Sequence, residues 1–199
     1  MKIFIKATAL VLCAVIAAFA LVSCGKETEG EIIEGEIYAD IVIKDYGTIT
    51  VKLDADAAPI TVANFVKLAN DGFYEGLTFH RIKEGFMMQG GNGAMAGKSA
   101  ASIKGEFAAN GVENNLSHTR GAISMARTNV MDSASSQFFI VHQDSTFLDG
   151  QYAAFGYVTE GMDVVDEVCE SSRPTDNNGT IPTANQPVIK EIVIRDGTK

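Results

Sequence analysis

The chain has 199 residues, of which 46% are hydrophobic and 21% are charged, and its formal net charge at pH 7 is -9. This length and composition suit one folded domain with its own hydrophobic core and disfavour a disordered or repetitive chain. The acidic balance disfavours nucleic acid and anionic lipid headgroups as partners, because phosphate groups bind basic surfaces.

The first 23 residues have the layout of a signal sequence. Lys2 and Lys6 form a basic region, and an apolar run over residues 7–22 follows it. This run is shorter than the roughly 20 residues that a membrane-spanning helix needs, so cleavage is favoured over a retained anchor. Residues 21–24 resemble the bacterial lipobox, which predicts a signal peptide over 1–23 and a lipid on Cys24. The alternative is an ordinary signal peptide followed by an accidental cysteine.

Cleavage would change the charge and the cysteine content of the chain. Without Lys2 and Lys6 the formal charge of -9 becomes -11, so attachment to a membrane would depend on the lipid. The sequence therefore predicts an extracytoplasmic, membrane-anchored lipoprotein of the bacterial cell envelope. Cys169 would then be the remaining unmodified cysteine, and the helical apolar pattern before it predicts a buried, unreactive thiol.

An acidic tether precedes the predicted domain. Residues 24–36 carry few large apolar side chains, which is typical of a solvated linker. Apolar and other residues then alternate over 37–44, which predicts a strand. A turn at 45–47 and a second β-branched run at 48–53 complete a hairpin. The predicted domain covers residues 37–196.

The rest of the chain predicts many short strands and two helices. Pro59 opens a helical pattern that ends near Gly72, and a second helical pattern covers 162–170. Further strands are predicted at residues 77–82, 86–89, 121–125, 136–141, 153–158 and 188–194. Two helices are too few for the crossovers of a parallel sheet, so the pattern favours a closed antiparallel barrel.

Several catalytic motifs are missing from the sequence. It contains no GxSxG, no HExxH and no Walker glycine loop, and its three histidines lack the spacing of metal ligands. Hydrolase and metalloenzyme functions therefore have no support, and we expect neither a cofactor nor a metal.

Arg81 is the notable polar residue of the predicted strands. In a strand over 77–82, Leu77, Phe79 and Arg81 would share one face that is otherwise apolar. A charged group is rarely placed there without a function or a partner. The alternative is an arginine that reaches solvent past an aromatic ring.

Four segments of the chain resemble the cyclophilin-type peptidyl-prolyl cis-trans isomerases. In chain order they read NFVKLANDGFYEG, FHRIKEGFMMQGG, HTRGAISMARTN and SSQFFIVHQDSTFLDGQYAAFG. The resemblance runs from about residue 37 to residue 194. It implies a mainly β fold, an eight-stranded closed antiparallel β-barrel capped by two α-helices, with the site on the outer surface of the barrel.

The resemblance also implies the role of individual residues. Arg81 would be the catalytic cation, and Gln89 would be the side chain that holds it. The substrate-binding residues that it implies are Phe86, Met87, Ala126, Arg127, Phe138, Phe147, Leu148 and Tyr152. Phe147 and Tyr152 differ from the commonest eukaryotic pattern, which has tryptophan and histidine at these positions.

The chemistry of proline isomerisation suits an arginine. Rotation about a peptide bond is opposed by about 18–20 kcal/mol, and the catalyst must prefer the twisted amide, whose nitrogen gains a lone pair. Arginine is always charged and offers N–H donors in a fixed geometry. The resemblance thus implies peptidyl-prolyl isomerisation in proline-containing secreted or envelope polypeptides, by a chain that we expect to be monomeric. The alternative is a non-catalytic peptide-binding or holdase chaperone, which would use the same groove but would not require Arg81 with Gln89.

Overall fold

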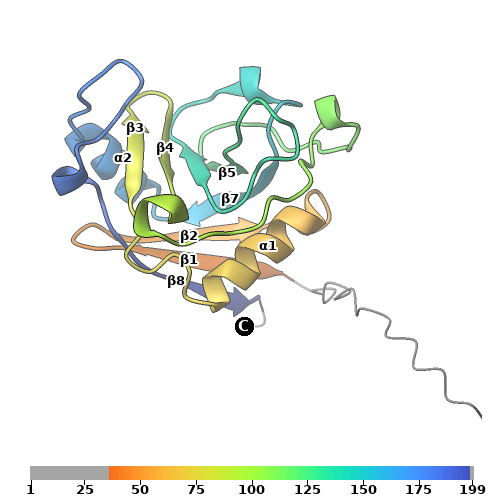
Figure 1. Ribbon diagram of the computed structural model, residues 1–199, viewed down its shortest axis with the longest axis horizontal. Helices are drawn as coiled ribbons and strands as arrows, with labels where there is room; N and C mark the ends of the chain where they lie inside the picture. Colours follow the sequence, from red (N-terminus) through yellow and green to blue (C-terminus); the bar gives the residue numbers. More distant parts are fainter. Residues whose placement is uncertain (1–35, 198–199) are drawn as a thin grey trace, which may run out of the picture. The chain divides into compact units, whose positions relative to one another are not determined.

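The computed structural model of the protein describes residues 36–197, which contain eight strands and two α-helices (Figure 1). The strands are β1 (Ile37–Ile43), β2 (Gly47–Leu53), β3 (Phe79–Lys83), β4 (Met87–Gly90), β5 (Ala122–Met125), β6 (Phe138–Val141), β7 (Ala154–Glu160) and β8 (Ile189–Asp196). The helices are α1 (Pro59–Asn70) and α2 (Met162–Ser171). Each predicted strand and helix is present, and the ends differ from the prediction by at most two residues.

The predictions for the N-terminal part of the chain fall largely outside this description. The signal peptide over 1–23, the lipid on Cys24 and residues 24–35 of the tether lie outside the described residues. Among residues 36–197, neither helix has the length and apolar character needed to cross a membrane.

The eight strands form one antiparallel sheet in the order β3-β4-β6-β5-β7-β2-β1-β8. The antiparallel prediction is confirmed, but the closed barrel is not, because the sheet is an open half-barrel. The outer edge of β3 is occupied by an irregular segment, residues 179–181, and the N–H of Ile82 donates to the carbonyl of Gly179 (2.8 Å). β3 is therefore unavailable for pairing with β8. Thr78 and Val188, the residues directly before these two strands, form an isolated bridge.

The inner face of the sheet packs on the main hydrophobic core. α1 lies against β8, and α2 lies against β2 and β4. Phe65 of α1 and Val165 of α2 are fully buried in this core. A second, smaller apolar cluster is centred on the outer face, around Met87, Phe139 and Leu148. The neighbouring strands β3, β4, β6, β5 and β7 each bury side chains of their inner face in the main core. The outer cluster buries side chains on the opposite face of the sheet.

The start of α1 depends on a residue far along the chain. Pro59 suits the first turn, but Ala58, the residue that precedes the helix, makes no side-chain capping hydrogen bond. The carboxylate of buried Glu106 instead accepts the N–H groups of Ile60 (3.0 Å) and Thr61 (2.7 Å). This negative charge also suits the positive end of the helix dipole.

Cys169 lies in the core on α2, where its exposed fraction is 2%. Burial, assisted by the nearby carboxylate of Asp166, raises the pKa of the thiol to about 12. The thiolate, which is the reactive form, is therefore scarce at neutral pH. The prediction that Cys169 is buried is confirmed.

Candidate active site

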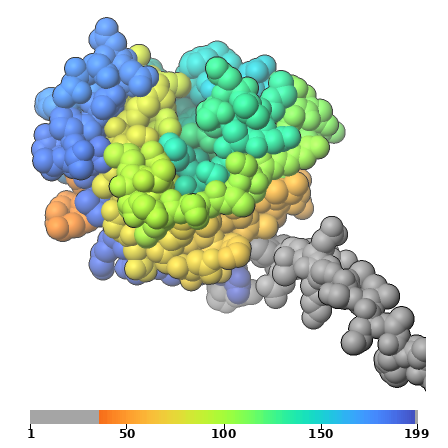
Figure 2. Space-filling view, viewed as in Figure 1, coloured from red at the N-terminus to blue at the C-terminus, as the bar shows by residue number. Residues whose placement is uncertain are grey.

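A cavity of about 300 Å³ lies over the outer cluster of the sheet. It is lined by Arg81, Phe86, Met87, Gln89, Ala126, Arg127, Phe139, Phe147, Leu148 and Tyr152. Figure 2 shows a hollow between the yellow and the teal segments on one face of the molecule. The structure thus brings together nine of the ten predicted site residues, and the tenth, Phe138, is replaced by its neighbour.

The pleat of β4 and β6 decides which side chains face this cavity. On β4, Met87 and Gln89 point outward, whereas Met88 points into the core. On β6, Phe139 belongs to the outer cluster, and Phe138 belongs to the main core. Successive residues of a strand point to opposite faces, so a shift of one position moves a side chain from the cavity to the core.

The prediction that Phe138 lines the proline pocket is therefore wrong. Its ring is fully buried and packs edge-on against the rings of Phe65 (5.5 Å) and Tyr74 (5.6 Å). Phe139 lines the cavity in its place. All four residues of β6 are buried, so the hydrophobic pattern contains no alternation from which the choice between two adjacent phenylalanines could be made.

Arg81 reaches the cavity in a way that the sequence pattern did not predict. Phe79 is buried in the core, so it does not share a face with Arg81 as a regular strand would require. The register between β3 and β4 shifts between these two residues, since Phe79 pairs with Gly90 and Arg81 pairs with Gln89. A bulge of this kind turns the side chain that follows it toward the other face of the sheet.

The guanidinium of Arg81 is held by neutral hydrogen-bond acceptors. Its Nη1–H donates to Oε1 of Gln89 (3.1 Å), and its Nε–H donates to the carbonyl of Asn178 (2.8 Å). Gln89 is oriented in turn, because its Nε2–H donates to Oε1 of Gln137 (3.0 Å). No ion pair with a carboxylate within 4.0 Å occurs for Arg81 among residues 36–197. Arg81 therefore lines the cavity with a charge that no described carboxylate offsets within 4.0 Å.

Aromatic and aliphatic side chains form the wall beside this cation. Cζ of Arg81 lies 5.9 Å from the centroid of the Phe86 ring, and that ring lies 5.6 Å from the ring of Phe147. Leu148 is 9% exposed, whereas Phe147 is 71% exposed, so the wall is buried at its base and open at its rim. Arg81, Phe86 and Leu148 thus line one cavity, whereas Phe138 does not line it. The arrangement can hold a compact apolar ring next to a fixed hydrogen-bond donor.

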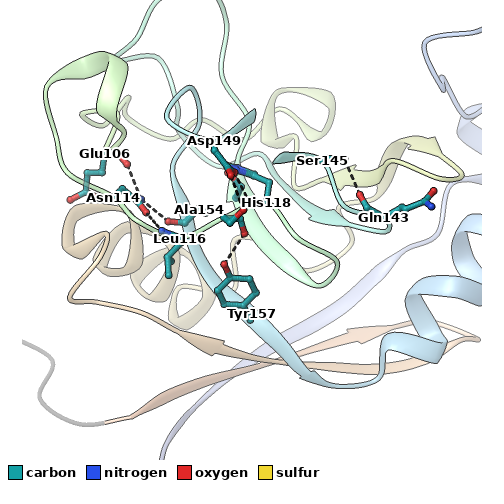
Figure 3. Close-up of polar contacts among 11 residues, drawn as sticks. Glu106, Asn114, Leu116, His118, Gln143, Ser145, Asp149, Ala154 and Tyr157 are labelled. Carbon is teal, nitrogen blue, oxygen red and sulfur yellow. Dashed lines mark hydrogen bonds and ion pairs between the residues drawn. The ribbon is translucent and has the colours of Figure 1, made fainter. Parts of the chain in front are cut away.

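His118, Ser124 and Asp149 form a polar cluster next to Phe139 and Leu148, and Figure 3 shows the contact between His118 and Asp149. Nδ1 of His118 lies 2.8 Å from Oδ1 of Asp149, and Nε2 lies 3.0 Å from Oγ of Ser124. The carboxylate can only accept, so Nδ1 carries the proton and the hydroxyl of Ser124 donates to Nε2. The imidazole stacks on Phe139 with an interplanar angle of 18°, and Asp149 directly follows Leu148. His118 thus contacts Phe139, which lines the cavity, and Asp149, the neighbour of the lining residue Leu148.

The pKa values of this pair keep His118 neutral and Asp149 charged. Burial lowers the pKa of His118, although the hydrogen bond to Asp149 opposes the shift. Burial by itself would raise the pKa of Asp149, but hydrogen bonds from Ser117 and from the backbone and ring of His118 lower it.

Sequence reasoning missed Phe139, Gln137, Asn178 and His118. Gln137 could have been found, since it lies directly before β6 and two residues before Phe139, so that strand alternation places it on the side of the cavity. The carbonyl of Asn178 carried no signal, because it is 97 residues from Arg81 along the chain and any residue type supplies a carbonyl. Within residues 36–197, no group of three or more His, Cys, Asp or Glu side chains could hold a metal ion.

Comparisons with known proteins agree with this geometry. A family model described as cyclophilin type peptidyl-prolyl cis-trans isomerase matches residues 38–196. The chain is 46% identical over 157 residues to peptidyl-prolyl cis-trans isomerase A of Dickeya dadantii, covering 75% of this chain and 77% of that protein. It is 45% identical over 124 residues to peptidyl-prolyl cis-trans isomerase B of Bacillus subtilis, covering 61% and 83%.

The fold is also similar to solved structures. A cyclophilin type peptidyl-prolyl cis-trans isomerase from Cryptosporidium parvum superposes with a TM-score of 0.70 at 26% identity, covering 82% of this chain and 99% of that one.

Proposed function

The chain belongs to the cyclophilin-type peptidyl-prolyl cis-trans isomerase family, and from this premise we propose that it rotates X-Pro bonds by means of Arg81. As a member of this family it is an isomerase, and its substrates are proline-containing polypeptides. The observation that supports Arg81 as the catalytic group is its fixed guanidinium beside an apolar pocket in a single cavity.

The reaction requires a preference for the twisted amide. Rotation removes the resonance of the peptide bond and leaves a lone pair on the proline nitrogen, to which an N–H of Arg81 can donate. The same cation can instead steady the carbonyl oxygen of the preceding residue. One well-placed donor contributes about 2.7–4 kcal/mol, whereas a millionfold acceleration requires about 8 kcal/mol.

The apolar wall supplies the remaining stabilisation. Phe86, Met87, Phe139 and Leu148 hold the proline ring in place and exclude water, which otherwise stabilises the large dipole of the planar amide. No bond is broken, so neither a nucleophile nor a general base is needed. The absence of a cofactor requirement follows from this chemistry.

A non-catalytic peptide-binding or holdase chaperone remains the second candidate function. The same apolar groove would serve it, but capture of a peptide does not require a guanidinium fixed at two of its nitrogens. The two hydrogen bonds that connect Gln137, Gln89 and Arg81 favour catalysis, because they orient an N–H donor and add no apolar surface for peptide binding.

Substitution of Arg81 tests the proposed function. We expect Arg81→Ala to fold normally and to lower kcat/KM on an X-Pro peptide by about 100-fold or more, since the principal donor is lost. Arg81→Lys should recover little of this activity, because lysine has a single nitrogen and cannot occupy the positions of both Nε and Nη1, which bond Asn178 and Gln89. Circular dichroism checks the fold. A wild-type rate in Arg81→Ala would exclude this mechanism. If the wild type isomerises no peptide and binds peptides as tightly as Arg81→Ala does, the holdase function is favoured.

We further propose that the chain is a monomeric lipoprotein of the bacterial cell envelope that acts on secreted or envelope polypeptides. The basic residues, the apolar run over 7–22 and the lipobox-like residues that end at Cys24 support this proposal. Labelling with a radioactive fatty acid tests it. We expect incorporation into the wild type that is lost in Cys24→Ser, and globomycin should leave the labelled chain in its longer, uncleaved form. An unlabelled wild type would contradict lipidation.

A further inference from the structure

The groove contains positive charges and no negative ones. A second cavity of about 110 Å³ adjoins the first and shares Gln89, Ala126 and Arg127 with it. Its other lining residues are Thr128, Ser133, Ser135 and Gln137. The two linings together include Arg81 and Arg127 but no aspartate or glutamate, in a chain whose net charge is -9. The charge of the groove is therefore opposite to that of the whole protein.

Arg127, which lines both cavities, is held rigidly. Its Cζ lies 4.9 Å from the centroid of the Phe107 ring and 4.7 Å from that of Tyr152, so the guanidinium is stacked between two aromatic faces. Its Nε–H and Nη2–H donate to the carbonyl of Gln151 (3.0 and 2.8 Å), and its Nη1–H donates to the carbonyl of Thr128 (2.8 Å). A cation fixed in this way loses little conformational freedom when a ligand binds.

The charge of Arg127 is not neutralised by any described carboxylate. Arg120 pairs with Asp166 at 2.7 Å, and Arg195 pairs with Asp40 at 2.6 Å. Among residues 36–197, no carboxylate lies within 4.0 Å of Arg127, and all of its hydrogen-bond acceptors are neutral carbonyls. A fixed, half-buried and uncompensated cation at a binding groove favours a ligand that brings a negative charge.

We propose that Arg127 is a specificity-determining residue that selects X-Pro substrates carrying aspartate or glutamate within about two residues of the proline. An extended peptide advances about 3.3 Å per residue, so a side chain one or two positions from a proline seated at Phe139 and Leu148 can reach the adjoining cavity. Lysine and arginine at the same positions are disfavoured, because Arg81 and Arg127 repel them. This inference rests on the proposed function, since it concerns the choice of substrate in the same groove.

The test uses a set of matched peptides in a protease-free isomerisation assay by NMR exchange. Each peptide contains one X-Pro bond, and the residues one and two positions away on either side are varied among Glu, Gln and Lys. We expect kcat/KM to be about fivefold higher with Glu than with Lys at the preferred position, a ratio in the range of a partly exposed charge pair. The preference should decrease as ionic strength rises, because salt screens exposed charges.

Two variants assign the preference to Arg127. In Arg127→Gln the ratio of Glu to Lys peptides should fall toward one. Lys44→Gln changes the net charge equally at a position that lines neither cavity, and it should keep the wild-type ratio. The salt dependence of the wild type provides a second measurement should Arg127→Gln not fold.

The outcomes separate this inference from the proposed function. Isomerisation of all peptides at equal rates would overturn the charge selectivity and leave the isomerase activity standing. An undiminished preference in folded Arg127→Gln would overturn the role of Arg127. If no peptide is isomerised faster than in buffer, the proposed function itself fails, and the selectivity fails with it.

Discussion

Individual side chains of the groove are fixed by partners that do not reduce their charge. Arg81 donates to an amide oxygen and a backbone carbonyl, and the guanidinium of Arg127 donates only to backbone carbonyls. A carboxylate partner would also fix an arginine, but it would offset the positive charge that the substrate must experience. Neutral acceptors therefore combine a fixed geometry with a full charge.

The two adjacent phenylalanines of β6 give a matched test at the scale of one residue. We expect Phe139→Leu to lower kcat/KM at least tenfold on folded enzyme, because the ring that faces the substrate is lost. Phe138→Leu should mainly lower the free energy of unfolding, by about 1–3 kcal/mol, because its ring packs only in the core. Urea unfolding and peptide isomerisation measured on both variants check the expectation. The reverse assignment of effects would restore Phe138 to the pocket.

At the scale of elements, the segment 174–180 links the end of α2 to the catalytic strand. The side chain of Asp176 accepts the N–H groups of Asn178 and Thr180, each at 3.0 Å, and these hydrogen bonds lower the pKa of its carboxyl group. The turn that results presents the carbonyl of Asn178 to Arg81. Gly179 is suited to this turn, since its φ is +94° and a Cβ would lie 2.6 Å from the carbonyl oxygen of Ile82.

Loss of the Asp176 side chain should therefore act on catalysis through Arg81. We expect Asp176→Ala to lower kcat roughly tenfold with little change in KM, because the turn loosens and the guanidinium is less well placed. Asp176→Asn keeps an acceptor oxygen at the same place and should restore most of the rate. Steady-state kinetics of the two variants checks this positioning role. Equal kinetics for Asp176→Ala and the wild type would show that the segment does not hold Arg81.

At the scale of the whole molecule, the buried His118 and the partly buried His80 connect stability to pH. Burial lowers the pKa of both His118 and His80. The unfolded chain therefore binds protons near pH 6.5, at which the folded chain still keeps these rings neutral. The contribution is fully present above about pH 6.5 and is lost as the pH falls toward the folded pKa values. The lowered pKa of Asp149 means that the free energy of unfolding decreases further at still lower pH, as this carboxylate becomes protonated.

We accordingly expect the free energy of unfolding to fall between pH 7.5 and pH 5. His118→Asn should show a smaller decrease over this interval, because the asparagine amide can donate to Asp149 but does not titrate. His80 keeps part of the slope in that variant. Urea unfolding at several pH values gives the comparison. A slope in His118→Asn as steep as that of the wild type would mean that His118 does not govern the acid sensitivity.

Much of the fold followed from local patterns. The alternation in β1, the proline at the start of α1 and the short β-branched runs predict their elements within two residues, because backbone geometry and the burial of one face act over a few neighbours. The family resemblance supplied nine of the ten site residues that line the cavity. Similar motifs keep the same residue types in the same order along the chain. Within a strand this order determines which face each side chain points to, once the register is known.

Only the tertiary structure decided the features that depend on register and on distant partners. The bulge in β3 turned Arg81 away from the face of Phe79, and the pleat of β6 placed Phe139 rather than Phe138 in the cavity. Residues 179–181 hydrogen-bond to the edge of β3, so that the half-barrel does not close, and this contact likewise joins segments far apart in the chain. Local composition specifies which residues can form a strand. A one-residue shift of strand register, or a hydrogen-bond partner 97 positions away such as Asn178 for Arg81, changes the site without changing that composition.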